Sequence, residues 1–242
     1  IIIDQTNKNI FDINPSRKSL DIKQYFRNYP KKERDKVKFV TLDLYKPYYK
    51  LMHSLFRNAI LIPDRFHIVI QARNALDKTR INLCKKSNPN YKKFKKYWKL
   101  LLKDKRDLDK KKKKYQTCFK KEMTQYDIVS YLLNTNEELY ETYQIYQSIL
   151  YSIDTRNKEI FLSIINGKNK KISKYMKKAL KTFRNMKKYI LNAFDYEYSN
   201  GIVEGTNNLI KQIKHTAYGY RKFKHLKARV MLIKGLYNPI KA

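Results

Sequence analysis

The segments VKFVTLD (37–43) and AILIPD (59–64) decide the fold of this chain. Each is a short apolar run that ends in a carboxylate, and the residues between them place apolar side chains at helical spacing. A strand, a short helix and a second strand predict a parallel pair, because a crossover of this kind joins strands that run in the same direction. Parallel strands bring their carboxyl ends to one edge of a sheet. We therefore expect Asp43 and Asp64 at the edge where open α/β folds place their active sites.

The residues before these segments predict a hairpin and a helix. An extended run at 1–3 and a second apolar run at 10–13, with a polar turn between them, are typical of a hairpin. Pro15 and Ser16 are favoured at the start of a helix, and this helix is expected to run as far as Pro30.

The residues after these segments predict helix almost to the end of the chain. From about 65 to 195 the pattern is wholly helical. One further helix is expected from near Asn200 to Gly219, and another from about Phe223 to Leu236. The chain is therefore expected to be an α/β protein with predominant helix, in one fold with an insertion.

Basic residues dominate the charge of the chain. Lys and Arg number 55 against 21 Asp and Glu, which gives a formal net charge of +34. An AT-rich genome raises Lys without any binding function, but it raises Glu equally, and Glu is scarce. A polyanionic partner explains the asymmetry, with nucleic acid first and a membrane surface second.

No segment marks the chain for a membrane or for export. No stretch approaches the roughly 18 consecutive apolar residues that span a bilayer, and the first residues lack the features of a signal peptide. Cys84 and Cys118 have no CxxC spacing and no nearby His, which is typical of reduced, structural cysteines. The sequence therefore predicts a cytoplasmic protein.

Asp43 and Glu204 are candidate functional acids, although each has a simpler explanation. An acid that ends an apolar strand is costly unless it is paired, solvated or bound to a metal, but Asp is also a favoured helix cap, and on position alone the cap leads for Asp43. Glu204 lies in the first turn of a helix, where the dipole alone stabilises an acid by about 0.3–1 kcal/mol. Asn208 and Lys211 fall near the same helix face, which suits a metal ligand whose neighbours touch phosphate.

Asp64 and His67 form a D-x-x-H pattern at the start of a helix. The spacing suits a metal ion, but a capping Asp with a hydrogen-bonded His is the more common explanation.

A dense basic segment, KKFKKYWK (92–99), interleaves lysines with aromatic residues; the lysines are Lys92, Lys93, Lys95, Lys96 and Lys99. A charge run is usually a solvated face or a flexible turn. Here the density favours contact with phosphate groups, which weakens steeply with salt, and Lys92, Lys93, Lys95 and Lys96 are the predicted DNA contacts. A basic amphipathic helix on a membrane is the weaker alternative.

Five blocks of the sequence carry a resemblance to a known family. They are VTLDLYKPYYKL (40–51), ILIPDRFHIV (60–69), QARNALDKTR (71–80), ALKTF (179–183) and SNGIVEGTNNLIKQIKHTAYGYRKF (199–223). In this order, with a helical segment between them, they resemble the DDE transposases of bacterial insertion sequences, specifically the ISL-three family.

The resemblance implies a fold and its domains. The expected fold is a partial ribonuclease H-like core interrupted by a long all-helical insertion. The expected domains are residues 1–70 (partial core with hairpin, helix and parallel strands), 71–195 (insertion) and 196–242 (C-terminal helices that return to the core).

The resemblance also implies a chemistry. In this family three acidic residues hold two divalent ions that cleave DNA strands and transfer them to new positions. By resemblance Asp43 is the second acid and Glu204 the third, both catalytic and both metal ligands, while Asp64 and His67 are accessory. Mg²⁺ is the expected ion, with Mn²⁺ as a substitute.

The implied partners are double-stranded DNA of the element ends and of the target, and further copies of the chain in a homo-oligomer on DNA. No membrane partner is expected. A cytoplasmic bacterial protein of this kind is nucleoid-associated when it is bound to DNA.

The family's first acid is expected upstream of the hairpin with which this chain begins. Asp4 aligns with a position that is not catalytic. The zinc-binding and helix-turn-helix regions of a full-length member are also expected upstream, so the sequence predicts a fragment whose cleavage activity is lost or severely reduced.

Two other functions remain open from the sequence. A non-catalytic, basic DNA-binding remnant of a transposase would bind DNA in a salt-sensitive way without metal-dependent cleavage. A basic helical RNA-binding protein would prefer RNA over duplex DNA, although the sequence has no recognisable RNA motif.

Overall fold

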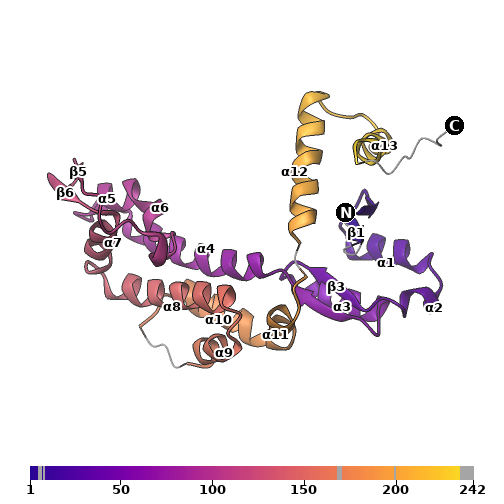
Figure 1. The fold of residues 1–242 in the computed structure, drawn as a ribbon, viewed down its shortest axis with the longest axis horizontal. Helices are drawn as coiled ribbons and strands as arrows, with labels where there is room; N and C mark the ends of the chain where they lie inside the picture. Colours follow the sequence, from indigo (N-terminus) through magenta and orange to yellow (C-terminus); the bar gives the residue numbers. More distant parts are fainter. Residues whose placement is uncertain (5–6, 8, 168–170, 199, 235–242) are drawn as a thin grey trace. The chain divides into compact units, whose positions relative to one another are not determined.

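Residues 1–64 and 196–242 form one compact unit of the protein, here called the split unit, and residues 65–195 form a second, the helical unit. The computed structural model describes residues 1–4, 7, 9–167, 171–198 and 200–234. Figure 1 labels the elements in chain order, and each unit is described by itself.

The split unit holds short strands and helices from both ends of the chain. Its elements are β1 (Ile2–Asp4), β2 (Asn9–Asp12), α1 (Ser19–Arg27), α2 (Lys31–Arg34), β3 (Phe39–Leu42), α3 (Lys46–Leu55), β4 (Ile60–Pro63), α12 (Gly201–Thr216) and α13 (Phe223–Ile233).

The predicted parallel pair is confirmed. β3 and β4 pair in parallel, with Phe39 opposite Ile60 and Leu42 opposite Pro63. The crossover between them is α3, as expected for strands that run in the same direction. Both strands therefore end at one edge, and Asp43 and Asp64 follow immediately.

The predicted N-terminal hairpin is also confirmed, since β1 and β2 pair in antiparallel fashion. Its Ile10 and the following Ile13 are buried in a small apolar cluster with Ile213 of α12 and with Leu226 and Val230 of α13. The second half of α12 is therefore held by the hairpin and by α13 through burial of apolar surface.

The ribonuclease H-like core stays a prediction. Among the described residues the strands form three separate two-stranded sheets, β1–β2, β3–β4 and β5–β6. The confirmed class is a helix-dominant α/β protein with small sheets.

Several helix bounds differ from the sequence prediction: the helix expected as far as Pro30 ends at Arg27, and the helix expected as far as Gly219 ends at Thr216. The helix expected to open at Pro15 and Ser16 begins instead at Ser19. The side chains of Asn14 and Ser16 accept the backbone N–H groups two residues ahead, at 3.1 Å in both cases, so this segment forms local turns. The last helix ends at Ile233, and Leu236 lies outside the described residues.

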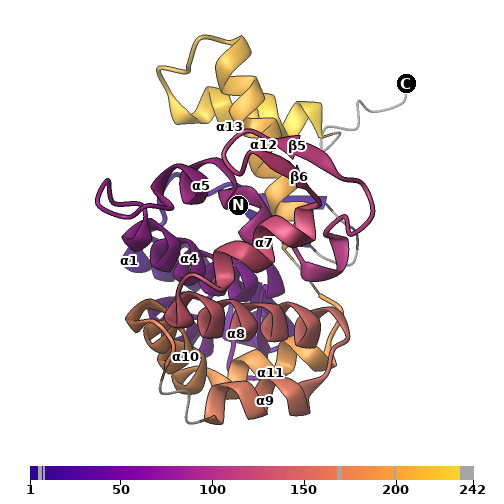
Figure 2. The ribbon, with the colours of Figure 1, turned by 90° about the vertical axis from the view of Figure 1, so that its left-hand side faces the viewer.

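The helical unit is built around three helices that pack together, α4 (Arg65–Leu83), α8 (Glu137–Asp154) and α10 (Lys174–Asn185). Figure 2 views this unit from its end and shows α8 beside α4, which also packs against α10. The remaining helices are α5 (Tyr91–Lys96), α6 (Trp98–Leu101), the short 3₁₀ helix η1 (Lys105–Asp107), α7 (Gln125–Leu133), α9 (Lys158–Asn166) and α11 (Lys187–Asp195).

The prediction of an all-helical segment over 71–195 was wrong in one place. Residues Lys114–Gln116 (β5) and Lys121–Met123 (β6) form an antiparallel hairpin. Lys120 turns the chain between the strands with a φ of 54°. These strands have mostly exposed, polar side chains, so they lack the apolar alternation that signals a strand in a sequence.

Candidate active site and basic surface

Asp43 lies at the carboxyl end of β3, where its side chain is exposed. The capping explanation does not fit this position, because the N-cap residue of the following helix α3 is Tyr45. The carboxylate therefore stands at the strand edge without serving as that helix's cap, and solvent relieves the cost of placing an acid there.

The segment that returns to the split unit runs along β3 towards Asp43. The rings of Tyr196 and Tyr198 each lie 4.9 Å from the ring of Phe39, measured between centroids. Further along, the Nδ2 of Asn200 donates a hydrogen bond to Oδ1 of Asp43 at 3.2 Å. Residues more than 150 positions apart in sequence therefore meet at the end of the strand.

Asn200 also connects Asp43 to the helix that carries Glu204. The backbone N–H of Glu204 donates to the carbonyl oxygen of Asn200 at 3.0 Å, in the first turn of α12. Residues four apart share one face of a helix, so Glu204 lies one turn beyond Asn200 on the same face. Asn200 therefore contacts Asp43 through its side chain and Glu204 through its backbone.

The exposed face of α12 continues past Glu204. Asn208 and Lys211 follow it at spacings of four and seven residues, and all three side chains are exposed. The helix thus offers a carboxylate, an amide and an ammonium group in a row, and its other face is buried at Thr206 and Ile213.

Asp64 and His67 lie in different surroundings from Asp43 and Glu204, which are both exposed. Asp64 is buried, with 7% of its surface exposed, and its backbone N–H donates to the carbonyl oxygen of Leu42 at 3.0 Å. His67 lies half-buried in the first turn of α4. Asp64 ends the first segment of the split unit, whereas His67 belongs to the helical unit, so their joint accessory role stays a prediction.

Asp4, which the sequence left unassigned, belongs to the hairpin. Its Oδ2 accepts a hydrogen bond from Nδ2 of Asn7, a turn residue between the two strands, at 2.6 Å.

The oxygen atoms near Asp43 suit a divalent ion. Among the described residues no group of three or more His, Cys, Asp or Glu side chains could hold a metal, so the acids alone do not complete a site. Oδ1 of Asn200, however, is buried and accepts no hydrogen bond from the described part of the chain. A carboxylate beside an unsatisfied amide oxygen, with a second carboxylate one turn along, is the all-oxygen donor set that Mg²⁺ and Mn²⁺ prefer.

Sequence reasoning missed Asn200 as a site residue. An Asn just before a helix is expected to cap it, and Asn200 is indeed the N-cap of α12. Its side chain makes no capping hydrogen bond, however, and is directed to Asp43 instead. Only the three-dimensional contact distinguishes the two roles.

The predicted DNA-contacting lysines of the helical unit divide into two kinds. Lys92, Lys95 and Lys96 of α5 are exposed, and the ammonium of Lys96 also donates to Oγ1 of Thr117 at 3.0 Å. Lys93 is partly buried and its ammonium contacts the rings of Phe119 and Tyr131, at 4.9 and 4.4 Å from the ring centroids. Lys93 therefore joins α5 to the hairpin and to α7, whereas its neighbours face solvent.

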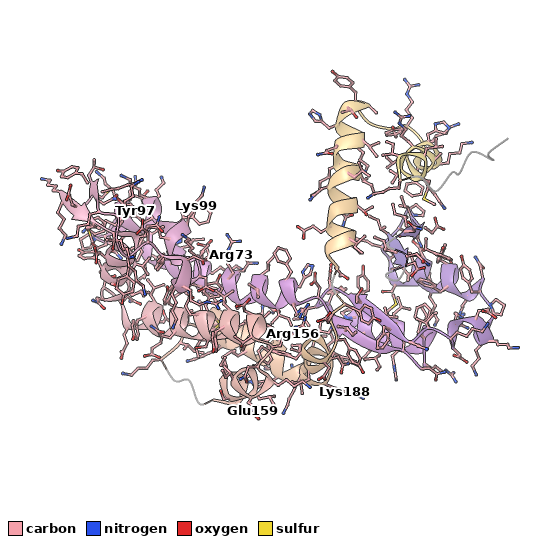
Figure 3. All side chains as sticks on the ribbon, in the orientation of Figure 1. Arg73, Tyr97, Lys99, Arg156, Glu159 and Lys188 are labelled. Atoms are coloured by element: carbon pink, nitrogen blue, oxygen red, sulfur yellow. The ribbon has the colours of Figure 1, made fainter. Side chains whose placement is uncertain are left out.

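A second run of lysines lies beside these exposed residues. Oδ1 of Asp109 accepts the backbone N–H groups of Lys111 and Lys112 at 2.9 Å, and these hydrogen bonds hold the pKa of Asp109 below its usual value. The run continues into β5, where the hydroxyl of Tyr97 donates to Gln116 at 2.9 Å. Figure 3 labels Tyr97 and Lys99 at the end of the helical unit that bears this hairpin. The basic surface is defined as the exposed lysines Lys92, Lys95, Lys96, Lys99, Lys110, Lys111, Lys112, Lys113 and Lys114.

Asp43 follows a parallel strand, Glu204 lies in the first turn of α12, and the helical unit carries a surface of exposed lysines. These features belong to a helix-dominant α/β protein with small sheets. The comparisons with known proteins identify the family. Residues 1–230 match the ISL3 (ISL-three) family, described as "Transposase", and the chain belongs to this family of DDE transposases.

Two curated relatives match parts of the chain. The transposase for insertion sequence element IS1001 of Bordetella parapertussis is 24% identical over 229 residues, which cover 91% of this chain and 53% of the relative. A Lactococcus lactis subsp. lactis protein named "ATP-dependent protease" is 36% identical over 125 residues, which cover 50% of this chain and 40% of that protein. The matched part of the chain thus covers 53% of one curated relative and 40% of the other. No solved structure matches it.

In the part of the chain that the structure describes, none of the helices has the length and apolar character needed to cross a bilayer. Both cysteines, Cys84 and Cys118, are free thiols, in agreement with the sequence prediction.

Proposed function

We propose that this chain forms the catalytic region of a transposase that cleaves and transfers DNA strands with divalent metal ions. One observation carries the proposal: Asn200 hydrogen-bonds to Asp43, and its carbonyl accepts the amide of Glu204. These contacts support the proposal, because both acids that the family resemblance assigns to catalysis belong to one unit and contact the same residue. A ribonuclease H-like core with the acids at the ends of its strands is the architecture that we propose for the split unit.

Asp43 and Glu204 would hold the metal ions, and Mg²⁺ is the ion that their oxygen donors favour. When bound, such ions activate a water or a 3′-hydroxyl and stabilise the leaving oxygen of a phosphodiester. Asp64 and His67 are proposed as accessory residues.

The protein's own residues would hold the DNA. Asn208 and Lys211 continue the exposed face of α12 beyond Glu204, where an amide and an ammonium can contact the phosphates next to the scissile bond. The basic surface of the helical unit would contact phosphates elsewhere on the duplex, and the formal net charge of +34 supports a polyanionic partner. Assembly of several copies on paired element ends, in association with the nucleoid, is also proposed.

The metal site is tested by Mn²⁺ binding, measured from the electron paramagnetic resonance signal of the free ion. We expect Asp43→Ala and Glu204→Ala each to weaken Mn²⁺ binding by about tenfold or more, because each removes a charged oxygen ligand. Glu138→Ala is the matched control, since Glu138 is an exposed acid in the first turn of α8, and it should bind Mn²⁺ as the unchanged protein does.

The chemistry is tested by nicking of duplex DNA in Mg²⁺ by an intact version of the transposase. Nicking should disappear in both acid variants and persist in Glu138→Ala. Nicking that is unchanged in both acid variants would contradict the proposal. Salt-sensitive DNA binding with no Mn²⁺ affinity at all would instead support a non-catalytic DNA-binding protein.

A further inference from the structure

The orientation of the Asn200 side chain is not explained by the position of this residue at the start of α12. It is the N-cap residue of α12, but it makes no side-chain capping hydrogen bond. Only 8% of its surface is exposed. An asparagine that is buried and does not cap its own helix must be held there by another partner.

The two ends of this amide face different surroundings. Nδ2 donates to Oδ1 of Asp43 at 3.2 Å, whereas Oδ1 is buried and accepts no hydrogen bond from the described residues. A buried amide oxygen without a partner is costly, and such oxygens in folded proteins are satisfied by protein, water or an ion. The orientation is fixed by chemistry, because only the NH₂ end can donate to a carboxylate.

Asn200 also contacts both acids of the proposed site. It touches Asp43 directly, and the backbone carbonyl of the same residue accepts the N–H of Glu204. A neutral oxygen here would add a metal ligand without adding negative charge beside the carboxylate of Asp43.

We infer that Asn200 is a further residue of the metal site, which orients Asp43 through Nδ2 and supplies Oδ1 as a neutral oxygen ligand for the divalent ion. This inference rests on the proposed function, because it assumes that Asp43 and Glu204 bind that ion. No cofactor other than the ion is involved, and no bond is made or broken at Asn200.

The test is Mn²⁺ affinity in the full chain, measured for three substitutions of this residue. Asn200→Ala removes both the donor and the oxygen, and we expect it to weaken Mn²⁺ binding by about 10–100-fold. Asn200→Asp restores an oxygen ligand and loses the donor, so it should recover most of the affinity. Asn200→Leu keeps a similar volume without polar atoms and should behave as Asn200→Ala does.

Two controls separate metal binding from folding. Gln212→Ala removes an exposed amide further along α12 and should leave Mn²⁺ affinity unchanged. Hydrogen exchange of the α12 amides reports whether a variant unfolds this helix. If Asn200→Ala keeps its α12 protection but loses Mn²⁺ affinity, and Asn200→Asp regains it, the ligand role stands.

Other outcomes would overturn the inference. Mn²⁺ affinity equal to that of the unchanged protein in Asn200→Ala and Asn200→Leu, while Asp43→Ala loses it, would remove Asn200 from the site and leave the proposed function intact. Equal loss in Asn200→Ala and Asn200→Asp would assign Asn200 to orienting Asp43 alone. Mn²⁺ affinity that does not change in Asp43→Ala would instead remove the proposed metal site itself.

Discussion

Asp12 at the end of β2 holds the last described helix of the split unit to the hairpin. Its carboxylate accepts hydrogen bonds from the hydroxyl of Tyr25 at 2.8 Å and from the backbone N–H of Ile13 at 2.6 Å, and it forms an ion pair with Lys227 of α13. Burial alone would raise the pKa of Asp12, but the hydrogen bonds from Lys227 and Tyr25 outweigh this effect and lower that pKa.

The lowered pKa of Asp12 predicts how the split unit responds to acid. The stabilising contribution is present above the ordinary pKa of an Asp, about 3.9, and is lost as the pH falls through the lower pKa of the folded state. Asp12→Asn should therefore make the amides of β1 and β2 exchange faster at pH 7, as measured by hydrogen exchange.

The same variant should have little effect once the carboxyl is protonated. The stability difference between Asp12→Asn and the unchanged protein, measured by urea unfolding, should shrink steadily as the pH falls below the ordinary pKa of an Asp. A difference that stays constant across this range would show that the carboxylate charge contributes nothing.

Asp43 and Glu204 could be identified as candidate site residues from the sequence, whereas Asn200 could not. The sequence singled out Asp43 and Glu204 because acids at a strand end and in a first helical turn can be recognised along the chain. Asn200 could not be recognised, because its task depends on a contact with a residue 157 positions away.

At the scale of elements, a buried polar chain joins the three central helices of the helical unit. Oγ1 of Thr142 on α8 accepts the backbone N–H of Ser173, at 3.0 Å. Oγ of Ser173, the N-cap of α10, accepts the hydroxyl of Thr79 on α4 at 2.7 Å and the N–H of Met176 at 3.2 Å. All three hydroxyl-bearing residues are at most 1% exposed, so each hydrogen bond is made where water cannot replace it.

Removing one acceptor from this chain should destabilise the helical unit. Thr142→Val keeps the volume but leaves the N–H of Ser173 unpaired, so we expect a loss of about 1–3 kcal/mol in the free energy of unfolding. The protein's single tryptophan, Trp98, lies in this unit, and its fluorescence during urea unfolding provides the measurement.

Thr142→Ser is the matched control, because it restores the hydroxyl and loses only a methyl group. It should recover most of the lost stability. Equal destabilisation by both substitutions would attribute the effect to packing instead of the hydrogen bond.

Elements were predictable where pattern and topology agree. The pair β3–β4 followed from two apolar runs and a short crossover, and the first hairpin followed from two apolar runs around a polar turn. The hairpin β5–β6 was missed because Tyr115 and Glu122 face each other as exposed side chains in strands without a buried apolar face. The start of α1 was misplaced because side chains of Asn14 and Ser16 bind the backbone locally.

At the scale of the whole molecule, the helical unit is one continuous stretch of chain, residues 65–195, with buried apolar residues of its own. Phe94, Leu132, Phe161 and Phe183 are among its fully buried side chains. A unit with its own core is expected to fold when it is separated from the rest of the chain.

The excised fragment 65–195 should therefore unfold cooperatively, as reported by Trp98 fluorescence, and should bind duplex DNA. The logarithm of its affinity should fall linearly with the logarithm of salt concentration, and Lys92→Ala with Lys95→Ala should reduce that slope by up to about 2 if each lysine contacts one phosphate. Fluorescence anisotropy of labelled DNA provides the measurement.

The same fragment should lack Mn²⁺ affinity, because Asp43, Asn200 and Glu204 belong to the split unit. A fragment that folds but binds DNA with no dependence on salt would contradict the assignment of the basic surface. The predicted domain bounds at 70 and 195 can be tested in the same way, by comparing fragments that begin at 65 and at 71.

The length of α12 between Glu204 and the apolar cluster fixes the rotational position of the Glu204 carboxylate. The first turn of α12 carries Glu204, while Ile213, about two and a half turns further on, is fixed in the apolar cluster with the hairpin and α13. Because each added residue rotates a helix by about 100°, an insertion between these two positions would swing the carboxylate around the helix axis and away from Asp43. The number of residues between Glu204 and Ile213 is therefore constrained, because this part of α12 sets the rotational position of the acid relative to the apolar cluster.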